Sequence, residues 1–195
     1  VIRNMASAIE ANFDELYRLL TSEQGKPHHQ AQHEIGACAG IMNAQSTLTL
    51  EETINEDSAE RLSRTRRVPV GVVAGIVPWN FPLLMAVQKI APAILTGCTI
   101  VLKPSPFTPL TTLKFAELIK DIVPAGVVNI ITGEDALGPM MTSHPDIDKI
   151  TFTGSTATGK RIMEGASKDL KRITLELGGN DASIVLPDAD VEKVA

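Results

Sequence analysis

The spacing of apolar side chains changes along the chain, from a helical period near the N-terminus to short apolar runs further on. Within residues 2–20, apolar side chains recur at every third or fourth position, which predicts one amphipathic helix. Gly25 and Pro27 are typical of a helix end and of the start of a new element, so we expect this helix to stop there. Residues 28–45, rich in Ala, Gln and His, predict a second helix.

From Val70 onward, short runs of apolar, often β-branched residues alternate with stretches of helical periodicity. Such short runs predict buried strands, and their alternation with helices predicts a parallel sheet that is covered on both faces. We therefore expect an α/β fold with a doubly wound parallel sheet, as in nucleotide-binding domains. The predicted strands are 70–77, 99–103, 127–131, 149–153 and 172–177, and the predicted helices are 82–96, 109–123, 134–143 and 156–168.

The segment 51–67, between the two parts, is strongly charged: its first half is acidic and its second half is basic. A basic arm that binds nucleic acid is one interpretation. An exposed hairpin whose opposite charges meet across its strands is the other, and the acidic half favours it.

The overall composition narrows the functional classes. The 195 residues are 44% hydrophobic and 21% charged, a balance typical of a globular protein. A net charge of −5 argues against nucleic acid or anionic membranes as partners, and no apolar run is long enough to span a bilayer. Two cysteines, Cys38 and Cys98, indicate free thiols in a reducing compartment, which we take to be the cytoplasm. His29 and His33 share a helix face, but we expect a solvated face and no metal site.

Both ends of the sequence look interrupted. Val1 lies inside a helical pattern, and Ala195 falls where another helix begins. We therefore expect the chain to be a fragment of a longer protein.

Polar residues follow the first two predicted strands at their carboxyl ends, where open α/β sheets bind ligands. Asn80 lies between the first strand and the following helix, and its carboxamide is a candidate functional group. Lys103 ends the second strand, where an ammonium group could bind ribose hydroxyls or a phosphate. A lysine that reaches out to solvent from a strand end is the plainer interpretation of Lys103.

The segment from Gly154 to Lys160 follows a strand and opens a helix, so its free N–H groups could attract a phosphate. It matches the first seven positions of a P-loop. The eighth position, which should be Ser or Thr to hold magnesium, is Arg161. We therefore disfavour a P-loop NTPase and favour a dinucleotide pyrophosphate, although the usual G-x-G-x-x-G fingerprint is absent.

Glu176 stands between two leucines at the end of the last predicted strand, beside Gly178 and Gly179. If the leucines bury it, desolvation would raise the pKa of its carboxyl group into the range of a general base. The alternative is an alternating strand on which Glu176 points to solvent, and periodicity does not decide between the two.

Together these segments resemble the aldehyde dehydrogenase superfamily, essentially from end to end. The resemblance is carried by Pro78-Trp79-Asn80-Phe81-Pro82, Lys103-Pro104-Ser105, Phe152-Thr153-Gly154-Ser155-Thr156, Leu175-Glu176-Leu177-Gly178-Gly179 and, in the N-terminal part, Glu23-Gln24-Gly25-Lys26-Pro27.

The resemblance implies oxidation of an aldehyde to a carboxylic acid with NAD or NADP, through a cysteine thiohemiacetal and thioester. Asn80 would donate to the oxyanion, and Glu176 would be the general base that activates water. Lys103 and Ser105 would contact the adenosine ribose, and Ser155 would hold the pyrophosphate. The cofactor-binding residues that it implies are Ile76, Pro78, Trp79, Lys103, Ser105, Pro106, Gly133, Thr153, Gly154, Ser155 and Leu177.

The sequence departs from the family pattern at three points. The family's catalytic cysteine lies beyond the position of Glu176, past the end of this chain, so we expect the fragment to be inactive. Pro106 replaces a glutamate that many NAD-preferring members use to bind ribose, which predicts tolerance of NADP. Gln88 replaces a frequent aromatic residue on the helix face shared with Phe81 and Met85, the expected substrate tunnel, which predicts a larger or more polar aldehyde.

The resulting division of the chain has four parts. We expect residues 1–45 to be helices that pack on the cofactor domain, and the resemblance implies that 46–68 form a hairpin arm for a homodimer or homotetramer. It also implies that residues 69–178 form the NAD(P)-binding domain and that 179–195 lead into the next segment. A non-catalytic dinucleotide-binding or scaffolding module is the alternative function.

Overall fold

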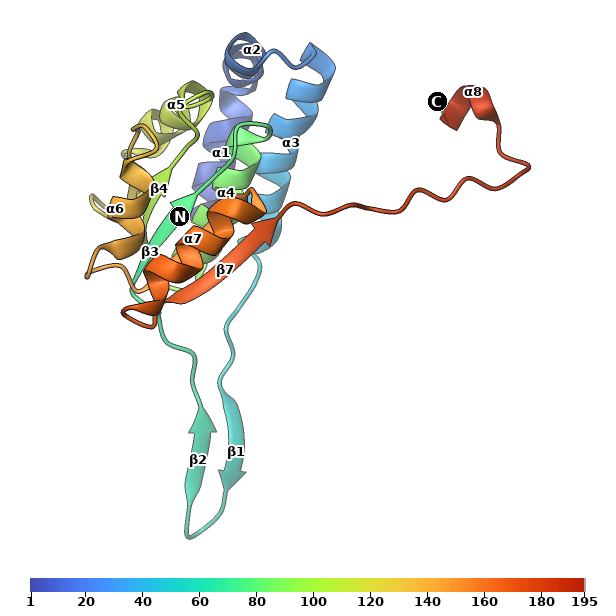
Figure 1. The fold of residues 1–195 in the computed structure, drawn as a ribbon. Coiled ribbons are helices and arrows are strands. Elements are labelled where there is room, and N and C mark those ends of the chain that lie inside the picture. Colours follow the sequence, from blue (N-terminus) through green and yellow to red (C-terminus); the bar gives the residue numbers. More distant parts are fainter. Residues whose placement is uncertain (195) are drawn as a thin grey trace.

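The computed structural model describes residues 1–194, which contain two sheets and eight helices. The central sheet has five parallel strands in the order β5-β4-β3-β6-β7, and this confirms the predicted doubly wound α/β fold (Figure 1). Its strands are β3 (Val72–Ile76), β4 (Thr99–Lys103), β5 (Val128–Ile130), β6 (Lys149–Gly154) and β7 (Arg172–Leu177). The helices between them are α4 (Pro82–Leu95), α5 (Leu110–Ile119), α6 (Leu137–Ser143) and α7 (Thr156–Ser167).

Two hydrophobic cores lie on opposite faces of the sheet. On one face, Val73 and Ile100 pack with α4, α5 and the N-terminal helices. On the other face, Ile150 and Phe152 pack against α6 and α7. Side chains alternate between the faces of a strand, so the central strands β3 and β4 contribute to both layers. The order of the strands therefore determines which helix covers which face.

The strands β6 and β7 depart from the predicted pattern of coverage on both faces. Their apolar residues face α7, whereas the alternate residues are polar and lie on the side of α4. Within residues 1–194, no helix covers this polar side of β6 and β7. The polar residues are Lys149, Thr151 and Thr153 in β6 and Arg172, Thr174 and Glu176 in β7.

The N-terminal part differs from its prediction at one point. Residues 2–20 were expected to form a single helix, but the structure has α1 (Ile2–Ala11) and α2 (Phe13–Gln24), separated at Asn12. The Asn12 side chain donates to the Ala8 carbonyl oxygen at 2.8 Å, and asparagine competes in this way with helix hydrogen bonds. The next helix, α3 (His28–Gln45), has the predicted bounds.

The charged segment forms an antiparallel hairpin, β1 (Thr53–Asp57) and β2 (Leu62–Thr65), which projects from the body (Figure 1). Arg64 contacts Glu52 at 3.3 Å, and Arg61 contacts Glu56 at 3.4 Å, so the opposite charges meet as expected. Beyond β7 the chain also extends away from the body and ends in the short helix α8 (Val191–Val194). Of the helices within residues 1–194, none has the length and hydrophobicity that crossing a bilayer requires.

Candidate functional site

The strand order places a crevice at the carboxyl edge of the sheet. The chain builds outward from β3 to β4 and β5, and then returns to place β6 on the other side of β3. The helices that follow β3 and β6, α4 and α7, lie on opposite faces of the sheet. At such a switch point the two helices diverge, and ligands of open α/β sheets bind between them.

A cavity of about 490 Å³ lies on the α6–α7 side of this edge, a size within the usual range for ligand sites. Five of the predicted cofactor-binding residues line it, contributed by the ends of β3 and β4 and the turns that follow them. They are Ile76, Pro78, Lys103, Ser105 and Pro106.

Lys103 is buried, with 5% of its surface exposed, so it does not reach out to solvent as the plainer interpretation supposed. Burial lowers the pKa of its ammonium group, and the carboxylates of Asp135 and Glu134 oppose that shift. Ser105 is also buried, and its hydroxyl accepts from the Phe107 N–H at 3.3 Å. A buried cation beside a hydroxyl group is suited to hold a polar, anionic ligand.

The start of α7 lies at the end of β6, beside the same cavity. Ser155 is the N-cap, and its hydroxyl accepts from the Thr158 N–H at 3.2 Å. The N–H groups of the first helical turn have no partner within a helix and can bind a phosphate. Thr158 lines the cavity, which brings this helix start within reach of the same ligand.

The glycines of the P-loop-like segment have packing roles in the structure. A β-carbon at Gly159 would come within 2.7 Å of the Leu177 side chain, so glycine allows α7 to lie close to β7. A β-carbon at Gly154 would meet the Phe152 ring at 2.5 Å. Close packing therefore accounts for both glycines, Gly159 between α7 and β7 and Gly154 beside Phe152.

The remaining predicted cofactor residues lie outside the wall of this cavity. Trp79 is 56% exposed, and its carbonyl oxygen accepts from the Thr108 hydroxyl at 3.2 Å. Gly133 follows β5, where a β-carbon would crowd Leu137. Thr153 is the last residue but one of β6, and Leu177 ends β7 at the same edge of the sheet, paired in register with Gly154.

Asn80 lies in the turn between β3 and α4 and is exposed. Its side-chain oxygen accepts from the Phe81 N–H at 3.1 Å, which leaves the Nδ2 group as the part that can donate to a substrate. The two candidate catalytic residues belong to strand ends that flank β6. Asn80 follows β3 and Glu176 lies in β7, so β6 separates the two strands at the same edge of the sheet.

Glu176 is exposed, so of the two arrangements that periodicity left open, residues 1–194 adopt the one in which its flanking leucines do not bury it. Leu175 packs with the α7 core, and the alternation along β7 turns Glu176 to the opposite, polar side. Its role as a general base stays a prediction.

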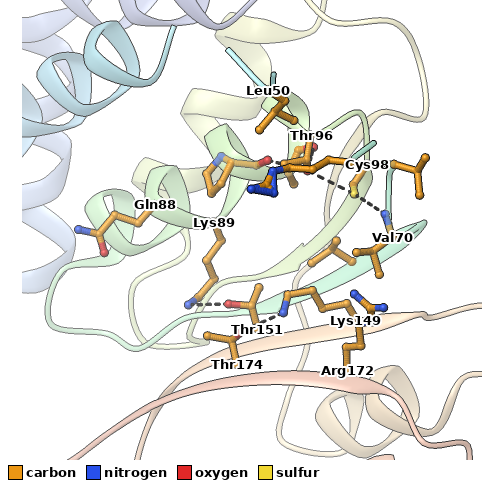
Figure 2. Close-up of a pocket in the computed structure, with 15 residues that line it drawn as sticks. Leu50, Val70, Gln88, Lys89, Thr96, Cys98, Lys149, Thr151, Arg172 and Thr174 are labelled. Carbon is orange, nitrogen blue, oxygen red and sulfur yellow. Dashed lines mark hydrogen bonds between the residues drawn. The ribbon is translucent and has the colours of Figure 1, made fainter. Parts of the chain in front are cut away.

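A second cavity, of about 620 Å³, lies over the polar side of β6 and β7, next to α4 (Figure 2). Gln88 belongs to its wall, whereas Phe81 and Met85 do not. Phe81 is 43% exposed and Met85 is partly buried, so the three predicted tunnel residues share an accessible helix face but not one cavity.

Lys89 is a residue of this cavity that the sequence analysis did not single out. It reaches from α4 to β6, where it donates to the Thr151 hydroxyl at 3.4 Å (Figure 2). It also donates to the Thr153 hydroxyl at 2.8 Å. Burial lowers the pKa of Lys89 from 10.5 to about 8, against the opposing attraction of the Glu176 carboxylate. The sequence could have pointed to Lys89, because it is the one charged residue within the otherwise uncharged segment 82–95.

Other residues of the first cavity were also missed. Asp135, Gly138 and Thr142 come from α6 and the turn before it, and Arg161 comes from α7. The rule that ligands bind at carboxyl ends of strands applies to β5 as well, and it could have drawn attention to the segment after it.

The two cysteines lie away from the carboxyl edge. Cys98 precedes β4 at the amino edge of the sheet, where its sulfur accepts from the Val70 N–H at 3.3 Å. Cys38 is buried in α3; burial raises the pKa of its thiol, and the Glu34 carboxylate raises it further. Within residues 1–194, no three His, Cys, Asp or Glu side chains are grouped to hold a metal ion.

The lowered pKa of Lys89 predicts how stability depends on pH. Between pH 8 and 10.5, unfolded Lys89 keeps a proton that folded Lys89 has lost, so the contribution of Lys89 to stability rises with pH in this window. Relative to Lys89→Met, we expect the unfolding free energy of the unmodified protein to rise by up to roughly 1.4 kcal/mol per pH unit. Urea unfolding of both proteins from pH 7 to 10 measures this difference, and parallel pH profiles would contradict the lowered pKa.

Comparison with known proteins agrees with this geometry. The model of the aldehyde dehydrogenase family matches residues 1–195. A putative aldehyde dehydrogenase of Gibberella fujikuroi is 43% identical over 194 residues, which cover 100% of this chain and 42% of that protein. The NADP(+) succinate-semialdehyde dehydrogenase of Escherichia coli is 42% identical over 198 residues, which cover 99% of this chain and 41% of that enzyme.

Among solved structures, the NAD-dependent aldehyde dehydrogenase from Sinorhizobium meliloti has a TM-score of 0.91 at 39% identity. The match covers 99% of this chain and 39% of that one. The chain thus spans about two fifths of the length of the relatives that it matches. Because the family pattern extends over the whole of the chain, the chain belongs to the aldehyde dehydrogenase family.

Proposed function

We propose that the natural protein containing this chain oxidises an aldehyde to a carboxylic acid with NAD⁺ or NADP⁺. The observation that carries the proposal is the convergence of Asn80, Lys103 and the start of α7 at one sheet edge, in a chain of this family. The S. meliloti relative is NAD-dependent and the E. coli relative uses NADP(+), which supports the cofactor class.

The cavity beside α6 and α7 has the chemistry that a dinucleotide requires. Lys103 and Ser105 would hold the adenosine ribose, and the N–H groups at the start of α7 would bind the pyrophosphate. The buried ammonium group of Lys103 adds a positive charge to the same cavity. When bound, the nicotinamide accepts a hydride from the substrate.

The proposed chemistry divides between two residues of this chain. The Nδ2 group of Asn80 would donate to the aldehyde oxygen as it becomes negatively charged under attack by a cysteine thiolate. In the family that cysteine lies beyond the position of Glu176. Glu176 would then accept a proton from the water that hydrolyses the thioester.

The substrate range is part of the proposal. Gln88 lies in the wall of the cavity beside α4, where its carboxamide adds a hydrogen-bonding group. We infer that the protein accepts larger or more polar aldehydes than short aliphatic ones.

The role of Asn80 predicts a loss of rate in Asn80→Ala. Because one oxyanion donor contributes about 100-fold or more, we expect kcat for aldehyde oxidation to fall by about that factor, with little change in cofactor affinity. NAD(P)H formation by the natural protein, measured with short aliphatic, aromatic and polar aldehydes, checks both this role and the substrate range. The control is Asn43→Ala, which removes a surface amide that bonds Glu10. Full activity of Asn80→Ala would refute the proposed role.

Pro106 in the cavity wall predicts that NADP⁺ is accepted, because proline brings no charge against a 2′-phosphate. Pro106→Glu should lower kcat/KM for NADP⁺ relative to NAD⁺ by at least about tenfold, through repulsion between like charges. The matched control is Pro106→Gln, because glutamine has nearly the shape of glutamate but no charge. It should change the ratio of kcat/KM for NADP⁺ to that for NAD⁺ less than Pro106→Glu does. An unmodified enzyme that strongly prefers NAD⁺ would contradict the inference.

The hairpin carries the proposed assembly into a homodimer or homotetramer through residues 46–68. Leu48, Leu50, Ile54 and Leu62 expose between 46% and 63% of their surfaces there, and burial in an interface would remove these apolar groups from water. Light scattering should give twice or four times the subunit mass, and Ile54→Asp with Leu62→Asp should shift it toward the monomer. A natural protein that is monomeric would contradict this assembly.

Two free, buried cysteines support a reducing compartment, for which we propose the cytoplasm.

A further inference from the structure

A buried ion pair lies under the turn that carries Asn80, and the chemistry described above does not use it. Lys26, between α2 and α3, is 8% exposed, and Glu34 in α3 is 1% exposed. The ammonium group of Lys26 is in direct contact with the Glu34 carboxylate. Both residues therefore come from the N-terminal helices, far in sequence from β3 and α4.

Each member of the pair makes a second contact, one with the turn between β3 and α4 and the other with the first helical turn of α4. Lys26 Nζ donates to the Asn80 carbonyl oxygen at 2.9 Å and lies 4.1 Å from the centroid of the Phe81 ring. Glu34 Oε1 accepts from the Leu84 N–H at 3.2 Å. The pair thus holds the chain at the end of the turn and at the first turn of α4.

The contact with Leu84 takes the place of a missing helix cap. The N-cap residue of α4 is Phe81, which has no side-chain hydrogen bond to offer. The Glu34 carboxylate satisfies one free N–H group of that helix end from another helix, and its negative charge suits the positive end of the α4 dipole.

Stability alone is a weak explanation for this arrangement. The desolvation of two buried charges offsets much of their attraction, and a well-packed apolar pair often stabilises a fold as well. What an apolar pair cannot provide is a donor for the Asn80 carbonyl oxygen and an acceptor for the Leu84 N–H. What the charged pair adds to packing is therefore a fixed orientation of the Asn80 and Leu84 peptide groups.

The neighbouring peptide group is held independently. The Thr108 hydroxyl donates to the Trp79 carbonyl oxygen at 3.2 Å, one residue before the carbonyl that Lys26 holds. With both carbonyls fixed and Asn80 Oδ1 bonded to the Phe81 N–H, the direction of the Asn80 Nδ2 group is determined.

We propose that Lys26 and Glu34 are positioning residues, which set the direction of the Asn80 Nδ2 group toward the substrate oxygen. They touch neither substrate nor cofactor. The inference rests on the proposed role of Asn80 and adds that this role depends on a buried ion pair from the N-terminal helices.

The test uses the natural protein and the variant Lys26→Met/Glu34→Gln, in the Asn80 and the Asn80→Ala backgrounds. Methionine removes the donor to the Asn80 carbonyl, whereas glutamine keeps an acceptor for the Leu84 N–H. Because a displacement of about 1 Å can cost up to about 100-fold in rate, we expect single-turnover NAD(P)H formation to slow by about tenfold. In the Asn80→Ala background, the same pair of substitutions should change the rate by less than about twofold, since there is no carboxamide left to position.

Two further variants complete the design. Glu34→Gln alone keeps Lys26 on the Asn80 carbonyl and should retain most of the rate. Lys114→Met breaks the ion pair with Glu15 (3.1 Å), remote from the turn, and should leave the rate unchanged. If circular dichroism shows that Lys26→Met/Glu34→Gln does not fold, Lys26→Gln/Glu34→Gln replaces it. Because glutamine at position 26 is shorter than lysine and uncharged, this replacement variant should slow the reaction by about threefold, and the slowing should again disappear in the Asn80→Ala background.

Slowing that disappears in Asn80→Ala would support the positioning role. Equal slowing in both backgrounds, or no slowing in either, would overturn it. A failure of the proposed function is distinguishable, because it would show as full activity of Asn80→Ala or as no aldehyde oxidation by the unmodified protein. Neither of those results involves Lys26 or Glu34.

Discussion

The position of β3 between β4 and β6 is the constraint on which the rest of the structure depends. Parallel strands need crossover connections, and these are right-handed. Growth of the sheet from β3 to β5 therefore places α4 and α5 on one face, and the return to β6 places α6 and α7 on the other. The helix starts separate where the direction reverses, and the cavity lined by Lys103 and Ser105 lies at this edge, whereas the cavity beside α4 extends toward the amino ends of β6 and β7.

The site region combines three buried lysines with different partners. Lys26 pairs with a carboxylate, Lys89 donates to two threonine hydroxyls, and Lys103 lies near two carboxylates that are not in contact with it. All three reach the carboxyl side of the sheet from different elements. Their charges favour the anions that the proposed reaction would bring there, namely the cofactor phosphates and an oxyanion.

The sequence was sufficient to predict the sheet because each strand is a short apolar run with clear helical segments between. The predicted bounds of β4, β7 and α3 agree with the structure. The break at Asn12 was missed because the apolar period continues through it, and only the competing side-chain hydrogen bond ends the helix. The exposure of Glu176 was left open by periodicity, and it follows from which face of β7 is covered.

Local motifs identified the residues that lie at strand ends, such as Asn80 and Lys103, because strand ends can be located from the sequence. Residues that act across the fold could not be found in this way. Lys26 lies 54 positions before Asn80 and Glu34 lies 50 positions before Leu84, and no local pattern connects these contacts. Lys89 is a similar case, since its partners lie in β6.

Hydrogen–deuterium exchange of the natural protein, with and without saturating NAD⁺, tests the central claim most directly, because it reports where a dinucleotide binds. If the crevice is the cofactor site, NAD⁺ will slow amide exchange at residues 103–108 and 154–158 and leave residues 2–11 in α1 unchanged. If NAD⁺ binds but slows exchange only elsewhere, the site assigned here is wrong.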